Sequence, residues 1–275
     1  MSRVYRRRFR VRGYELSATG HVHDSVFLNY VQQAAFEASA DAGYDTRQYH
    51  AMGTIWVIRK QTIAYLSPLA FGDVVEVKTW VSDFRRVRSH REYELRRVPD
   101  GNLVALAQAD WVYIDADSLF PRRIPPEVRE RMQANGVSAL DAAPPLEPAQ
   151  DVIGRPFVYR HRAKSYELDN LRHVNNAHYL NWLNQARLDA LRKLSDETQT
   201  GCPSPVRYEI EYFLPAMTGD EVQVHSQVVA VGETQLTWAH EIRRGEERLA
   251  TAQAITALEE GEATLIKTVL APAGQ

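Results

Sequence analysis

The residues best suited to do chemistry lie in one short stretch, from Asp169 to Asn176. Asp169 is the last residue of the short segment 166–169, and His173 follows four residues later. The Asn175-Asn176 pair begins a segment with helical periodicity. A carboxylate can act as a general base or as a nucleophile. Free N–H groups at the start of a helix can hold a polarised carbonyl oxygen. The pattern therefore predicts a carboxylate that faces a helix N-terminus.

The segment after this bend is a predicted helix with a broad apolar face. Its leucines recur at helical spacing, and aromatic and alanine side chains widen the apolar stripe. The face is too broad for a surface helix, so we expect the helix to be buried in a sheet. The residues concerned are Tyr179, Leu180, Trp182, Leu183, Ala186, Arg187, Leu188 and Leu191.

The same stretch occurs twice in the chain. Residues 14–35 align without a gap with residues 166–187, at a constant separation of 152 residues. Such an internal repeat indicates two copies of one structural unit. The informative difference is that Ser17 stands opposite Asp169. The identical pairs are Tyr14 and Tyr166, Glu15 and Glu167, Leu16 and Leu168, His21 and His173, Val22 and Val174, Leu28 and Leu180, Asn29 and Asn181, Gln33 and Gln185, and Ala34 and Ala186.

A further repeat follows, in which residues 65–75 match residues 212–222 through a shared Tyr, Pro and Gly-Asp. The Gly-Asp pair is a turn signature that leads into a strand. Each half is thus predicted to be an α+β unit, with an antiparallel sheet wrapped around one long central helix. The expected strands are 5–12, 54–65, 73–81, 88–97, 103–115, 157–164, 235–244 and 248–258, and the expected helices include 25–43 and 125–132.

The repeat divides the 275 residues, of which 44% are hydrophobic, into two ordinary domains. We expect the first domain over residues 1–135 and the second over residues 155–275. Residues 136–154 between them are rich in Ala and Pro, which predicts a linker laid across the surface.

Composition narrows the function classes. The formal net charge of -2 argues against a binder of nucleic acid or another polyanion. Cys202, in an expected loop, is the single cysteine, which excludes an internal disulfide framework and a cysteine-rich zinc site. No apolar run approaches the length of a membrane span. These features predict a soluble protein in a reduced, cytoplasmic setting.

The stretch Asp169-x3-His173-Val174-Asn175-Asn176 resembles the signature of hotdog-fold thioesterases, the 4-hydroxybenzoyl-CoA thioesterase-like group. Two copies in one chain resemble the fatty acyl-ACP thioesterases, which fuse two hotdog units. The resemblance implies a tandem, or double, hotdog of class α+β. It covers nearly the whole chain, and its most specific part is confined to about twenty residues.

The resemblance also implies roles for the residues of the motif. Asp169 is the catalytic carboxylate, acting as general base or nucleophile, and the backbone amide of Asn176 is the candidate oxyanion donor. Asn175 or Asn176 alternatively caps the helix. His173 either orients water or Asp169, or is structural. In plant acyl-ACP thioesterases an Asn two residues after the acid belongs to the site, and Leu171 stands there in this chain, which favours the bacterial Asp-dependent pattern.

The first copy is predicted to have lost catalysis, because Ser17 cannot replace a carboxylate as base. Its expected task is to complete the fold and to supply an apolar wall. Trp56, Ile58 and Phe36 are candidates for lining an acyl-chain pocket, with plain core packing as the alternative. Asp24 is expected to be the N-cap of the first helix. No metal or cofactor is expected.

Three function classes follow from these observations. The first is a hydrolase of acyl thioesters carried by acyl carrier protein or CoA. The second is a hotdog hydratase or dehydratase that pairs Asp169 with His173, and the third is a non-catalytic acyl-binding module. The basic run from Arg85 to Arg91, with Arg88 at its centre, suits an acidic carrier protein or the phosphates of CoA, or is a solvated hairpin. Whether two chains form a homodimer stays open.

Overall fold

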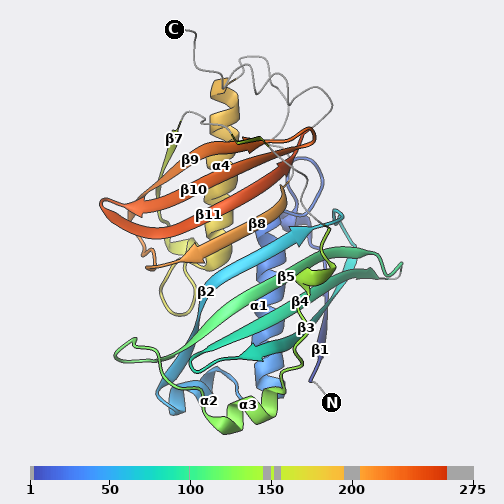
Figure 1. The fold of residues 1–275 in the computed structure, drawn as a ribbon, viewed down its shortest axis with the longest axis vertical. Helices are drawn as coiled ribbons and strands as arrows, with labels where there is room; N and C mark the ends of the chain where they lie inside the picture. The colour runs from blue at the N-terminus through green and yellow to red at the C-terminus, as the bar shows by residue number, and fades with distance from the viewer. Residues whose placement is uncertain (1–2, 99, 145–149, 152–155, 195–204, 259–275) are drawn as a thin grey trace. The chain divides into compact units, whose positions relative to one another are not determined.

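The computed structural model describes residues 3–98, 100–144, 150–151, 156–194 and 205–258. The chain divides into two compact units, Met1–Ala143 and Pro144–Gln275. Each unit contains one antiparallel sheet that lies against one long helix, as the resemblance predicted (Figure 1). Cys202, the tail after residue 258 and part of the expected linker lie outside the described residues.

The first unit has five strands in the order β1-β3-β4-β5-β2, and neighbouring strands are antiparallel. The long helix α1 comes before β2, and two short helices follow α1 and β5. The elements are β1 (Tyr5–Arg10), η1 (Gly13–Glu15), α1 (Asp24–Asp41), α2 (Thr46–Ala51), β2 (Thr54–Tyr65), β3 (Val74–Phe84), β4 (Arg88–Val98), β5 (Leu103–Asp115), α3 (Pro126–Met132) and η2 (Leu140–Ala142).

The second unit repeats this plan around α4. Its main strands have the order β8-β11-β10-β9, and β6 and β7 both pair with β9. The elements are β6 (Gln150–Asp151), β7 (Phe157–Arg162), η3 (Ser165–Glu167), α4 (Asn176–Leu194), β8 (Pro205–Tyr212), β9 (Glu221–Val231), β10 (Gln235–Arg244) and β11 (Glu247–Ala257).

The prediction of a buried central helix is confirmed in both units. The buried side chains of α4 spread around most of its circumference, and those of α1 do the same. Burial of this breadth is typical of a helix inside a protein rather than on its surface. The buried residues are Ser25, Val26, Phe27, Leu28, Tyr30, Val31, Ala34, Ala35 and Ala38 in α1, and Ala177, Tyr179, Leu180, Trp182, Leu183, Ala186, Arg187 and Ala190 in α4.

The beginning of α1 differs from the prediction. His23 is the N-cap residue and Asp24 is the first helical residue, so the expectation that Asp24 caps the helix is wrong. The physical reason is that the His23 N–H donates to the carbonyl of Glu15 at 2.9 Å, which fixes where the chain enters the helix. The end of α1 agrees with the prediction, because Gly43 takes the left-handed conformation, with φ +91°, directly after the helix.

The segment after α3 lies across one face of the first unit's sheet. The Trp80 indole N–H donates to the carbonyl of Val137 at 2.8 Å, and the Ala139 N–H donates to Glu92 at 2.9 Å. Ala139 and Leu140 pack with Trp80 and Leu106 in a small apolar cluster. Residues 137–143 are therefore anchored to the first unit.

The polar anchor of this segment generates a stability prediction. Glu92 is fully buried and accepts hydrogen bonds from Ser82, Gln108 and the Ala139 N–H. We expect Glu92→Ala to lower the free energy of unfolding by about 2–3 kcal/mol, because two buried donors and one half-buried donor lose their acceptor. Urea unfolding measures this loss. The control Glu94→Ala breaks only surface ion pairs, with Lys78 and Arg96, and should cost less than about 1 kcal/mol. Equal losses would contradict the assignment.

A buried histidine makes a second prediction, for the second unit. The His240 Nδ1 lies 2.8 Å from the Ser226 hydroxyl, and burial, reinforced by the charge of Arg187, lowers the pKa of His240 to about 3. The folded protein therefore keeps His240 neutral, whereas the unfolded chain binds a proton below about pH 6.5.

As the pH falls from about 6.5 towards 3, His240 should thus favour unfolding, by up to about tenfold in the unfolding equilibrium constant for each pH unit. His240→Asn removes the titrating group, so its stability should fall less steeply over the same range. Denaturant unfolding of both proteins at several pH values measures the difference. Parallel pH profiles would show that His240 is already protonated in the folded state.

Candidate active site

The predicted motif forms a tight hairpin turn in the second unit. The Asp169 N–H donates to the His173 carbonyl at 2.8 Å, and the Arg172 N–H donates to the Asp169 carbonyl at 3.0 Å. A β-bridge between Leu168 and Val174 closes the turn. Asp169 and His173 therefore stand at the two ends of one turn, and α4 begins three residues after His173.

The Asp169 carboxylate is partly exposed, and only one of its two oxygens accepts a hydrogen bond from the described residues. One oxygen, Oδ1, accepts the Leu171 N–H at 2.8 Å. Within the described residues, no hydrogen bond or ion pair reaches the other oxygen, and none joins the carboxylate to the partly exposed ring of His173. One carboxylate oxygen is therefore open to water or to a substrate.

The two asparagines at the start of α4 have different roles. Asn175 is the residue before the helix, and its Oδ1 accepts the Ala177 N–H at 2.9 Å while its carbonyl accepts the His178 N–H at 2.9 Å. Asn175 thus caps the helix. The Asn176 backbone N–H donates to nothing in the described part of the chain. A single open N–H remains at the positive end of the α4 dipole.

A buried carboxylate supports this turn, and the sequence analysis missed its role. Glu167 accepts hydrogen bonds from the Lys164 N–H at 2.7 Å and the Trp182 indole N–H at 3.1 Å, and it contacts His161 Nε2 at 3.0 Å. Its own carbonyl accepts the Asn175 N–H at 2.8 Å. Burial alone would raise the pKa of the Glu167 carboxyl, but these contacts lower it below its usual value. Glu167 therefore ties β7, the turn and α4 together.

The first unit has the same support at the equivalent place. Glu15 accepts the Arg12 N–H at 2.7 Å and the Tyr30 hydroxyl at 2.7 Å. Tyr30 occupies the helix position that Trp182 occupies in α4. The repeated Tyr-Glu-Leu run was the available signal, although the sequence could not show which helix residue each Glu would meet.

His178, in the first turn of α4, is another residue that the sequence analysis did not single out. Its ring is partly buried and lies 3.3 Å from the side-chain nitrogen of Asn181. Burial lowers the pKa of His178, which keeps the ring neutral near pH 7. The first copy has Val26 at this position, so the difference between the copies was the signal that could have identified it.

The turn of the first copy has the same backbone without the carboxylate. The Ser17 N–H donates to the His21 carbonyl at 2.7 Å, and the Ser17 hydroxyl lies 2.8 Å from that of Thr19. Asp24, at the position of Asn176, places a carboxylate at the first residue of α1. No group of three metal-ligating side chains was found in the residues that the structure describes, around His21 and His23 or elsewhere.

The three apolar candidates belong to the first unit and lie around its helix-facing layer. Ile58 is buried and stands opposite Trp111 in the β2–β5 register, and the ring centroids of Phe36 and Trp111 are 6.3 Å apart. The ring centroids of Trp56 and Tyr113 are 5.0 Å apart, in an aromatic cluster. Trp56 and Ile58 therefore pack as core, whereas Phe36 keeps 45% of its surface exposed.

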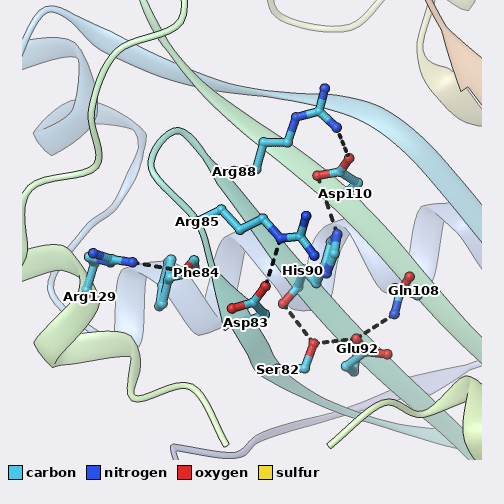
Figure 2. A network of polar contacts seen from close by, with 10 residues as sticks. All are labelled: Ser82, Asp83, Phe84, Arg85, Arg88, His90, Glu92, Gln108, Asp110 and Arg129. Carbon is cyan, nitrogen blue, oxygen red and sulfur yellow. Dashed lines mark hydrogen bonds and ion pairs between the residues drawn. The ribbon is translucent and has the colours of Figure 1, made fainter. Parts of the chain in front are cut away.

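The basic run from Arg85 to Arg91 does not form one surface. Arg88 is exposed and pairs with Asp110 at 3.0 Å, and Arg85 pairs with Asp83 at 3.2 Å at the β3–β4 turn (Figure 2). Arg91 is buried and contacts Thr79 and Met132, so including it in a solvent-facing patch was wrong. The reason is strand alternation, since Arg91 points to the face opposite that of Arg88 and His90.

An open groove of about 520 Å³ lies on the sheet of the second unit. It does not contain Asp169 or His173, and most of the residues that line it have polar side chains. Its polar lining includes Glu209, Glu211, His225, Gln227, Glu241 and Gln253.

Each half of the chain is similar to a known protein family. Residues 2–132 match the acyl-ACP thioesterase N-terminal domain, and residues 171–251 match the thioesterase superfamily. No helix among the described residues is long and apolar enough to cross a membrane.

Similar proteins include the acyl-[acyl-carrier-protein] hydrolase FATB2 of Cuphea viscosissima, 26% identical over 76% of this chain and 52% of that protein. The oleoyl-acyl carrier protein thioesterase 2 of Arabidopsis thaliana is 27% identical over 65% of this chain and 53% of that protein. The chain thus spans about half the length of the curated relatives it matches.

Many solved structures match this chain, including two thioesterases that cover more than nine-tenths of it. The 12:0-ACP thioesterase from Umbellularia californica matches with a TM-score of 0.74 and 19% identity, over 93% of this chain and 94% of that one. An acyl-ACP thioesterase from Bacteroides thetaiotaomicron matches with a TM-score of 0.68 and 18% identity, over 92% and 97% of the two chains. The predicted fold class, a double hotdog, is therefore confirmed, and the two halves of the chain are similar to the acyl-ACP thioesterase N-terminal domain and to the thioesterase superfamily.

Proposed function

We propose that the chain hydrolyses acyl thioesters at a single site, the Asp169 turn of the second unit. The observation that carries this proposal is the carboxylate of Asp169, of which one oxygen accepts no hydrogen bond from the described residues. It lies in the turn that leads into the long buried helix α4, whose first N–H has no acceptor in the same part of the chain. A thioester hydrolase needs both a group that activates the attack and a donor for the oxyanion.

In the proposed reaction, Asp169 either removes a proton from water or attacks the acyl carbon itself. A new C–O bond forms and the carbonyl oxygen becomes an oxyanion, which the Asn176 N–H and the α4 dipole stabilise. The C–S bond then breaks, and the sulfur leaves as the thiol with the proton that the attacking water gave to Asp169. If Asp169 attacks directly, the thiolate takes a proton from solvent, and water then hydrolyses the mixed anhydride on Asp169 to release the free acid. His173 orients the water or the carboxylate, and Asn175 holds the helix start in place.

The first unit lacks both requirements at the equivalent turn. Ser17 offers no carboxylate, and the Asp24 carboxylate at the first residue of α1 would repel a developing oxyanion. We therefore infer one working site per chain. Trp56, Ile58 and Phe36 remain proposed contacts for the acyl chain.

The names of the relatives support acyl carrier protein as the proposed carrier, with acyl-CoA as the other candidate. Arg88 remains a proposed contact of the carrier, although its pairing with Asp110 weakens that role. A cytoplasmic setting remains a prediction of the sequence, and the sequence leaves open whether two chains form a homodimer. The hydratase alternative would pair Asp169 with His173, and no hydrogen bond in the described chain joins their side chains.

Thiol release from matched acyl-ACP and acyl-CoA substrates tests the proposed function. Asp169→Asn should lower kcat by roughly 100-fold or more, because the amide can neither accept a proton nor attack the acyl carbon. Ser17→Ala, the matched change in the first copy, should stay within about twofold of the wild type. A wild type that releases no thiol, or an Asp169→Asn variant at full rate, would rule out this site.

The buried support of the turn gives a second prediction. Glu167→Gln and Glu15→Gln each remove a buried carboxylate from equivalent networks, so each should lower the free energy of unfolding by about 1–2 kcal/mol. Only Glu167→Gln should also lower kcat, because only that network holds the Asp169 turn. Denaturant unfolding and steady-state kinetics separate the two effects. An equal loss of kcat in both variants would contradict the single site.

A further inference from the structure

The second unit has a histidine beside the buried carboxylate that supports the Asp169 turn. His161, in β7, places its Nε2 at 3.0 and 3.1 Å from the two carboxylate oxygens of Glu167. Its Nδ1 lies 3.4 Å from the Tyr159 hydroxyl, and the ring centroids of His161 and Trp182 are 5.2 Å apart. Only 15% of the His161 side chain is exposed, so packing holds the ring against the carboxylate.

The first unit holds the equivalent carboxylate with a permanent cation. Arg12 lies 3.5 Å from Glu15, and an arginine keeps its charge over the whole pH range in which proteins fold. Phe9 stands at the position of His161 and stacks on Tyr30, with 4.8 Å between the ring centroids. The support of the first turn therefore contains no histidine.

In the second unit the cation depends on a proton. Lys164 stands at the position of Arg12, but it is exposed and makes no ion pair with Glu167 among the described contacts. The partner of Glu167 is His161, and histidine is the side chain that changes its charge between about pH 5 and 8. Hydrogen bonds between charged groups are roughly twice as strong as neutral ones. Protonation of His161 should therefore strengthen the support of the second turn.

Two titratable side chains of α4 lie near this pair. His178 is close enough to respond to both charges, and burial lowers its pKa, so it adds no positive charge near pH 7. Asp189 acts on the hydroxyl of Tyr159, and the β9 residue opposite the histidine is Val222, which cannot ionise. Glu167 is therefore the carboxylate that the histidine contacts directly.

We propose that His161 is a proton-dependent positioning residue of the Asp169 turn, a role that rests on the proposed hydrolase function. The Glu167 carboxylate accepts the Lys164 N–H, and the Glu167 carbonyl accepts the Asn175 N–H at the start of α4. Protonated His161 fixes Glu167 more firmly, and through it the turn and the helix start. As the pH rises, His161 loses its proton and this support weakens. The effect should fall on kcat, because His161 acts through Glu167 and not on the substrate.

The test compares two replacements of His161. His161→Gln keeps a neutral N–H donor, and His161→Phe introduces the side chain of the first copy, which has none. The control His225→Gln removes a half-buried histidine of β9 whose ring contacts Gln223. Thermal unfolding at pH 6 and pH 8 checks that each variant is folded. Thiol release from one acyl thioester is then measured between these two pH values.

At pH 6 the kcat of the wild type should exceed that of His161→Gln by roughly three- to tenfold, because a neutral donor replaces the imidazolium. At pH 8 the difference should shrink to less than about twofold, since both side chains then donate one neutral hydrogen bond. KM should stay within about twofold. His161→Phe should be slower than the wild type at both pH values, and His225→Gln should match it. The same ratio of wild-type to His161→Gln kcat at pH 6 and pH 8 would overturn the proposal.

A double-mutant cycle of His161→Gln and Glu167→Gln needs no substrate, and it separates this role from the hydrolase function. Denaturant unfolding of the four proteins gives the coupling between the two side chains. The coupling should be roughly tenfold in the unfolding equilibrium constant at pH 6 and less than about threefold at pH 8. Equal coupling at both pH values would remove the role of His161 and leave the hydrolase function intact. A pH-dependent coupling in a wild type that releases no thiol would refute both the hydrolase function and the positioning role.

Discussion

The structure of each unit depends on burying one long helix against the face of an antiparallel sheet. A helix begins with backbone N–H groups that have no partner within the helix, and a helix packed this way must supply partners for them. In the second unit the Asn175 side chain accepts the Ala177 N–H and the Asn175 carbonyl accepts the His178 N–H. Glu167 holds the segment that leads into the helix. The one N–H that is left, on Asn176, is the group that the proposed chemistry uses.

The two units share the residues that hold the turn in place and differ in residues proposed to take part in the reaction. The supporting carboxylates, Glu15 and Glu167, are kept in both copies, and each accepts a hydrogen bond from an aromatic side chain of its central helix. The groups that differ include three pairs in or next to the turn: Ser17 and Asp169, Asp24 and Asn176, and Gly20 and Arg172. These three differences change the charge of the turn, while the backbone hydrogen bonds of the turn are the same in both copies.

Much of this arrangement could be predicted from the sequence, because periodicity and turn residues act locally. Strands β2, β5 and β10 have the predicted bounds, and the repeat predicted two equivalent units. The errors came from contacts between elements. Asp24 does not cap α1, because the Glu15 carbonyl accepts the His23 N–H and so fixes where the helix begins. Arg91 is buried because its side chain lies on the inner face of β4. The left-handed conformation of Arg172 contradicts its residue type, so only its alignment with Gly20 could have indicated it.

We propose that the Asp169 turn and the Asn176 N–H form the one reacting site among the residues that the structure describes. A crystal structure of Asp169→Asn with a non-hydrolysable ketone analogue of an acyl-phosphopantetheine thioester tests it most directly. The account predicts one analogue per chain, with its carbonyl oxygen about 3 Å from the Asn176 nitrogen. An analogue bound at the Ser17 turn, or a carbonyl oxygen away from the start of α4, would contradict the account.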